Sequence, residues 1–174
     1  FGLIFQEKGV EVQTGVTSGN FSTDFNLNSG VNYLLNDAFY GNVIFESSGI
    51  AMSAVEGTTT RDSFIYNGSQ KRINSSFSNL NSSVDIQGDT GLIGISRFDS
   101  SNVSVYQKST EYQRTQSSGT LTNGNYNISH YRTNESDQVV SCTILSSSLT
   151  LSNITAFRSS YNSYLLDIGL TQYA

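Results

Sequence analysis

Short apolar runs recur along most of the chain and alternate with polar residues at a period of two. This alternation is typical of β-strands that bury one face and expose the other. Gly, Asn, Asp and Ser separate the runs and supply turns in a chain without proline. The pattern predicts about a dozen short strands, among them residues 10–13, 21–25, 38–46, 50–54, 63–66, 71–77, 91–97, 102–106, 111–115, 125–131 and 139–145.

Two turns predict hairpins between neighbouring strands. Asn67-Gly68 follows the run at 63–66, and Asn-Gly favours a tight hairpin because both residues tolerate a positive φ. Residues 107–110 also have the composition of a turn, after which 111–115 would return antiparallel to its neighbour.

The segment from Ser152 to Leu170 breaks the period of two, because its apolar residues recur at spacings of three and four. This spacing predicts one stripe of an amphipathic C-terminal helix from about 152 to 167. The stripe consists of Ile154, Phe157, Tyr161, Leu165 and Ile168. We expect Phe157, Tyr161 and Leu165 to be mostly buried against a sheet; a stripe that binds a partner is the alternative.

The ends of this helix carry suitable capping residues. The hydroxyl of Thr150 or of Ser152 can accept a hydrogen bond from the free amides of the first turn. Gly169 suits the C-terminal end, where the backbone often turns left-handed.

Length and composition predict one folded domain over residues 1–174. A chain of 174 residues can bury a single core, and no linker-like segment divides it. Only 13% of the residues are charged, whereas 30 Ser, 16 Thr and 17 Asn make the chain polar without charge. Ten Tyr and ten Phe supply large surfaces to bury, which argues against intrinsic disorder.

Charge and hydropathy exclude several partners. The net charge of −5, with scattered basic residues, provides no electrostatic surface for nucleic acid. No run of about 18 apolar residues is present, so we expect no membrane insertion. The chain begins at Phe1 rather than Met, and we expect it to be a processed product or a segment of a longer chain.

The single cysteine and single histidine limit the chemistry. Cys142 cannot form an internal disulfide, and its strand-like surroundings predict a buried small apolar residue rather than a nucleophile. His130 alone excludes any histidine cluster that would bind a transition metal. A Ser-His-Asp hydrolase would have to use His130, yet the chain contains no Gly-x-Ser-x-Gly motif.

Two stretches resemble the concanavalin A-like, laminin-G-like jelly-roll modules of phage and prophage structural and tail-fibre proteins. The first is the asparagine-rich segment 25–38 with the strand that follows it. The second runs from Gly91 to Leu170 and ends in Ser148-Leu149-Thr150 before the predicted helix. The family commonly has glycine where Ser148 stands. The resemblance covers most of the chain from about Asp24 onward, and its motifs are structural rather than chemical.

This resemblance implies an all-β fold: a concanavalin A-like jelly-roll β-sandwich with one C-terminal α-helix. It also implies a non-enzymatic module on a virion surface or in an extracellular setting, as part of a phage tail, fibre or head appendage. Its partners would be a glycan or host-surface receptor, other virion proteins and further copies of itself, with a trimer favoured. A purely structural, oligomer-forming capsid or appendage protein is the alternative, because the fold hosts many functions.

A carbohydrate-active enzyme on the same fold is the third hypothesis, and the residues favour it least. Retaining glycosidases need two carboxylates about 5–5.5 Å apart, and no strand carries carboxylates at the required spacing. The motif Tyr106-x-Lys108-x-x-x-Tyr112 resembles the Tyr/Lys strand of jelly-roll polysaccharide lyases, but its companion motifs are absent. We therefore predict no enzymatic activity.

Glycan binding by aromatic rings and neutral polar groups makes two loops the candidate site. These loops place Tyr66 beside Asn67 and Tyr131 beside Arg132. The same Ser, Thr and Asn residues would also simply solubilise a surface with few charges, so this alternative stays open. Calcium would need six to eight oxygen ligands, and no acidic spacing specifies them. We predict no cofactor and leave calcium unassigned to residues.

Overall fold

The computed structural model describes residues 3–6, 9–12, 19–26, 34–46, 51–56, 61–66, 90–119, 125–130 and 139–171, with side chains described at 34–43, 90–119 and 141–171. This part of the chain is mostly β and contains one helix. Its elements are β1 (Leu3–Gln6), β2 (Gly9–Val12), β3 (Gly19–Asn26), β4 (Ala38–Glu46), β5 (Ala51–Glu56), β6 (Arg61–Tyr66), β7 (Gly91–Arg97), β8 (Asn102–Gln107), β9 (Thr110–Thr115), β10 (Asn125–His130), β11 (Val139–Ser146) and α1 (Leu151–Asp167).

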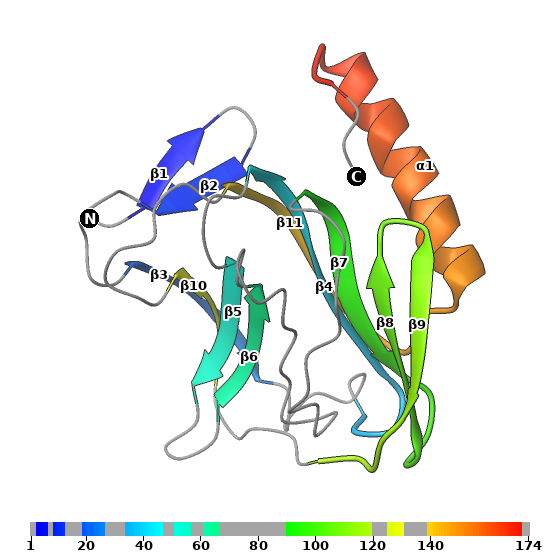
Figure 1. The fold of residues 1–174 in the computed structure, drawn as a ribbon. Helices are drawn as coiled ribbons and strands as arrows, with labels where there is room; N and C mark the ends of the chain where they lie inside the picture. Colours follow the sequence, from blue (N-terminus) through cyan, green and yellow to red (C-terminus); the bar gives the residue numbers. More distant parts are fainter. Residues whose placement is uncertain are drawn as a thin grey trace.

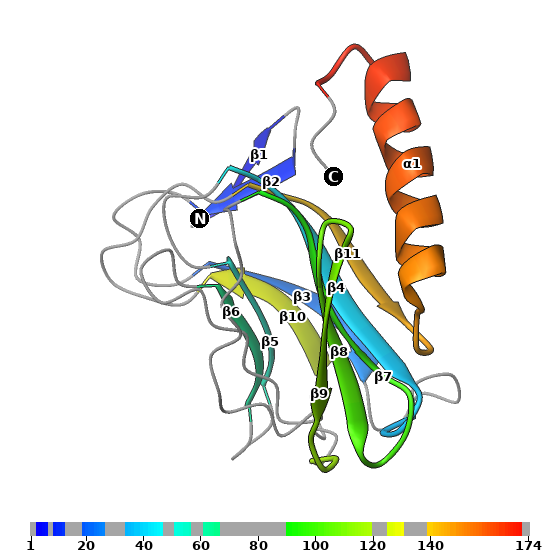
Figure 2. The same ribbon diagram turned by 45° about the vertical axis from the view of Figure 1, so that its right-hand side comes forward.

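The described strands form two antiparallel sheets. The larger sheet has the order β1-β2-β11-β4-β7-β8-β9, and the smaller has the order β3-β10-β5-β6. Figures 1 and 2 show α1 and the smaller sheet on opposite sides of the larger sheet. The larger sheet is therefore the middle layer.

The alternating pattern locates the strands well. β4 and β7 have the predicted bounds, and the turn between β8 and β9 lies where residues 107–110 predict it. β1 escapes prediction because its residues, Leu3–Gln6, form a short apolar run without alternation. The predicted strand at 71–77 and the Asn67-Gly68 turn lie outside the described residues, and β6 pairs with β5.

Two glycines make room for an aromatic ring at the centre of the larger sheet. Gly41 on β4 and Gly94 on β7 are direct partners in the register. A Cβ atom on Gly94 would lie 2.5 Å from Cζ of Phe39, and one on Gly41 would lie 2.7 Å from the same atom. Real Cβ atoms essentially never approach so closely, so only glycine fits at both positions. We call this pair the glycine notch, and the fully buried ring of Phe39 occupies it.

Phe39 belongs to a core that joins the sheet to the helix. Its other buried members are Val43 on β4, Leu92 on β7, Tyr106 on β8 and Ile154 on α1. Partly buried residues pack around them, namely Cys142, Ile144, Leu149, Phe157 and Tyr161. The helix therefore covers the four central strands, as the apolar stripe predicts.

The helix has a defined boundary at each end. Thr150 is the N-cap, and the side chains of Thr150 and Asn153 hydrogen-bond reciprocally with the backbone in a capping box. At the other end, Gly169 adopts a φ of +81°. The amides of Gly169 and Leu170 donate to the carbonyls of Leu166 and Leu165, which is a Schellman motif. The predicted caps, Thr150 and Gly169, are confirmed.

The apolar stripe is buried unevenly. Leu165 is buried as expected, and Ile154 with it, whereas Phe157 and Tyr161 are half-buried and stack with ring centroids 5.6 Å apart. Ile168 was expected on the same stripe, but 47% of its surface is exposed. The reason is that the helix ends at Asp167, so Ile168 is the C-cap and leaves the helical path.

The chain between β11 and the helix is anchored to the larger sheet by two polar residues. The Asp37 carboxylate accepts hydrogen bonds from the Ser148 hydroxyl at 2.6 Å and from the Ser148 amide at 2.8 Å. The Ser96 hydroxyl accepts one from the amide of Leu149 at 2.8 Å. The bonds from Ser148, the hydroxyl foremost, hold the pKa of Asp37 below its ordinary value.

We expect Ser148→Ala to lower the free energy of unfolding by about 1 kcal/mol at neutral pH and by less in acid. The lowered pKa of Asp37 stabilises the fold fully above the ordinary carboxyl pKa of about 3.9. That contribution is lost as the pH falls through the folded-state pKa. Urea unfolding from about pH 7 to about pH 2 measures this dependence. Ser147→Ala, at the exposed neighbouring position, is the control; equal pH profiles for the two variants would contradict the assignment.

Candidate functional site

The predicted site residues fall at the margin of the described chain. Tyr66 is the last residue of β6, and only its backbone is described. Asn67, Tyr131 and Arg132 lie outside the described residues. Whether these two loops come together therefore stays a prediction.

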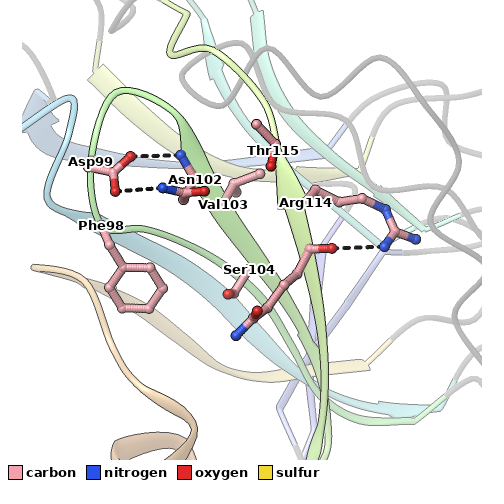
Figure 3. A pocket seen from close by; sticks show the side chains of 8 residues that line it. Phe98, Asp99, Asn102, Val103, Ser104, Arg114 and Thr115 are labelled. Carbon is pink, nitrogen blue, oxygen red and sulfur yellow. Dashed lines mark hydrogen bonds between the residues drawn. The ribbon is translucent and has the colours of Figure 1, made fainter.

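An open cleft occurs elsewhere, at the end of the larger sheet where β7 turns into β8. Its volume is about 370 Å³. The residues that line it come from the β7–β8 loop, from β8 and from the terminal strand β9, and Figure 3 shows them from close by. They are Phe98, Asp99, Asn102, Val103, Ser104, Gln113, Arg114 and Thr115.

A buried arginine fixes the loop that forms one wall of this cleft. Arg97 is fully buried, and its guanidinium donates to the carbonyl oxygens of Asp99 (3.2 Å), Gln116 (2.9 Å) and Ser117 (3.3 Å). Two backbone hydrogen bonds, from Gln116 and Ser118 to the Ser101 and Ser100 carbonyls, hold the same segments together. Burial lowers the pKa of Arg97. The loop is therefore held from inside the fold.

The carboxylate of Asp99 shapes the tip of the same loop. One oxygen accepts from the amides of Ser101 (2.6 Å) and Asn102 (2.7 Å), and the other accepts from the Asn102 side chain at 2.8 Å. These bonds, with the one from the Asn102 side chain first, keep the pKa of Asp99 below its ordinary value. Asp99 is a structural residue of the turn, because both of its oxygens already accept hydrogen bonds.

The aromatic ring of Phe98 stands at the mouth of the cleft. Phe98 has 37% of its surface exposed, although it directly follows the fully buried strand β7. Figure 3 shows its ring on one side of the β8–β9 pair, near the side chain of Ser104. The Arg114 side chain extends away on the other side, where it donates to the Gln113 carbonyl at 2.9 Å.

The described cleft does not match either of the two enzymatic sites considered from the sequence. Asp99 is the one carboxylate among the lining residues, so the cleft lacks the pair of acids that glycoside hydrolysis uses. The residues of the lyase-like motif do not line the cleft. The Tyr106 side chain is buried, and Lys108 lies in the β8–β9 turn with a φ of +52°. Cys142, predicted to be buried, is only partly buried against the core, and this partial burial raises the pKa of its thiol.

Metal-binding clusters are absent from the described chain. No three His, Cys, Asp or Glu side chains within the described ranges lie close enough to hold an ion. The described helix is also too short and too polar to cross a bilayer.

Sequence reasoning missed Phe98, although a signal was present. Phe98 is followed by Asp99-Ser100-Ser101-Asn102, which is an aromatic residue beside turn-forming polar residues. The same combination drew attention to Tyr66 and Tyr131. The signal at Phe98 is hidden because the residue also continues the apolar run that forms β7. A comparison of the chain with known protein families, curated proteins and solved structures finds no match.

Proposed function

We propose that this protein is a non-enzymatic surface module that binds glycans, with the cleft beside Phe98 as its binding site. The observation that carries the proposal is an exposed phenyl ring on a prearranged loop. Neutral hydrogen-bonding side chains of β8 and β9 line the same cleft. Sugars present a C–H face that stacks on aromatic rings and hydroxyls that pair with amides and hydroxyls. Because Arg97 and Asp99 hold the loop in place, binding costs little additional ordering.

We propose further that the two sheets form a concanavalin A-like jelly-roll sandwich. Support comes from their antiparallel pairing and from connections that cross between the sheets, such as those from β3 to β4 and from β10 to β11. In jelly rolls such crossings let two sheets enclose one core. The resemblance of segments 25–38 and 91–170 to phage structural modules points the same way.

We propose from the same resemblance that the module lies on a virion surface or in an extracellular setting, in a phage tail, fibre or head appendage. Its partners there would be a host-surface glycan, other virion proteins and copies of itself in a trimer. The low charge of the chain supports close packing of copies, because few charges must be desolvated when surfaces meet.

A structural, oligomer-forming role is the second candidate, and the C-terminal part of α1 with its C-cap favours it. Tyr164, Leu166 and Ile168 each expose about half of their surface there. Exposed apolar groups of this kind are enriched where proteins meet. A folded oligomer that binds no glycan would favour this role over adhesion.

Replacement of Phe98 by alanine is expected to weaken glycan binding about tenfold or more, because stacking on the ring contributes about 1.4 kcal/mol or more. A glycan array, with light scattering to size the oligomer, measures this. Tyr164→Ala is the matched control, since it removes an exposed aromatic ring far from the cleft. We expect equal binding with calcium and with chelator, because hydrogen bonds of Arg97 and Asp99, rather than a bound ion, hold the loop in place. Binding that survives Phe98→Ala would exclude this cleft as the glycan site.

A further inference from the structure

We infer that the cleft selects uncharged saccharides, which names the ligand class of the proposed glycan site and rests on that proposal. Two lining residues carry formal charge, namely Asp99 and Arg114. The Asp99 carboxylate accepts three hydrogen bonds from its own loop, within 2.8 Å. The turn thus uses three of the roughly four acceptor sites of this carboxylate, and its exposed negative charge would repel an acidic ligand.

Arg114 is turned away from the ring that would hold the sugar. Its guanidinium donates to the Gln113 carbonyl, and Figure 3 shows it on the far side of β9 from Phe98. Arg114 therefore lines the cleft without offering a cation beside Phe98. Among the residues that the structure describes, an acidic sugar stacked on Phe98 would find no cationic side chain on that side of the cleft.

Ser104, a polar residue that lines the cleft, is bonded to a negatively charged carboxylate. Oε1 of Glu111 accepts hydrogen bonds from the Ser104 hydroxyl at 2.6 Å and from the Tyr106 hydroxyl at 3.1 Å. Glu111 thus lies one hydrogen bond behind Ser104, which lines the cleft. A carboxylate or sulfate on the ligand near Ser104 would be repelled by this charge.

The remaining polar side chains of the cleft can form hydrogen bonds with the hydroxyl groups of a sugar. Ser104 has 3% of its surface exposed and gives its proton to Glu111, so it offers a ligand at most the acceptor side of its hydroxyl. The Gln113 amide and the Thr115 hydroxyl each donate and accept. Together with the Phe98 ring, this set fits a ligand with O–H donors on one side and an apolar C–H face on the other. A neutral pyranose has both features.

Calorimetric titration of the intact protein with paired saccharides tests the inference. The probes are a galactose-terminated oligosaccharide with and without a terminal sialic acid, and a glucose oligomer beside the corresponding glucuronate oligomer. We expect the neutral member of each pair to bind about tenfold more tightly. Its affinity should change less than about twofold between low and high salt, because no charge pair forms. Tighter, salt-sensitive binding of the acidic members would overturn the inference and leave glycan binding intact; no binding of any probe would remove both.

Two charge-neutralising variants test the roles assigned to individual groups. Glu111→Gln keeps the oxygen that accepts from Ser104 and Tyr106 while removing the negative charge. We expect it to strengthen binding of the acidic probes at least about threefold and to leave the neutral probes unchanged. Arg114→Gln should leave all affinities unchanged. Loss of binding in Arg114→Gln, or no gain for acidic probes in Glu111→Gln, would contradict the inference.

Discussion

Replacement of Phe39 by alanine is expected to lower the free energy of unfolding by about 3–5 kcal/mol. The ring is fully buried, fills the glycine notch and contacts the core that includes Ile154 of the helix. Its loss would leave a cavity that Gly41 and Gly94 cannot fill, because neither has a side chain. A loss of this size would remove a large share of the free energy of unfolding of a single domain.

Denaturant unfolding followed by circular dichroism measures this effect. Phe157→Ala is the control, because Phe157 packs on the same core but is only half-buried. We expect it to cost clearly less than Phe39→Ala. A loss below about 1 kcal/mol for Phe39→Ala, the size typical of surface changes, would show that the notch is not central to the fold.

Replacement of Gly94 by alanine is expected to cost about 1–3 kcal/mol through overpacking. The new methyl group would lie 2.5 Å and 2.7 Å from two ring atoms of Phe39 and 3.2 Å from the Tyr40 carbonyl oxygen. The ring cannot move aside without disturbing the core around Ile154. The same unfolding assay applies, and the smaller side chain in Phe39→Leu should relieve part of the clash.

A double-mutant cycle separates this clash from any general effect of alanine on the strand. The cost of Gly94→Ala should be at least about 1 kcal/mol smaller in the Phe39→Leu background than in the natural protein. Gly169→Ala gives a comparison without crowding, because nothing lies within 4 Å of its added methyl and only its φ of +81° is strained. Additive costs for Gly94→Ala and Phe39→Leu would contradict the proposed contact.

The elements that sequence alone predicted best are those with local signals. β4 and β7 show a period or an apolar run bounded by turn residues, and both match their predicted bounds. The helix start at Leu151 follows from the hydroxyl of Thr150 and the spacing of the apolar stripe. Such signals depend on residues that are close together in the sequence, so one sequence is enough to detect them.

The features that escaped prediction depend on pairing between distant segments. Gly41 and Gly94 look like ordinary strand glycines until the register of β4 and β7 brings them face to face. The loop that carries Phe98 is held by Arg97, which donates to the carbonyls of Gln116 and Ser117, just after β9. The candidate site could not be predicted for the same reason, because its two walls come from the β7–β8 loop and from β9.

The position of β11 between β2 and β4 has a consequence for biosynthesis. Asn42 and Thr143, which share a 2.8 Å hydrogen bond across β4 and β11, are 101 positions apart in the chain. On the ribosome, β2 and β4 therefore emerge long before the strand that joins them. Their facing edges stay open to wrong partners until the last fifth of the chain appears. We expect this protein to fold slowly and only once β11 has left the ribosome, and fragments that end before β11 to aggregate rather than persist as smaller folded units.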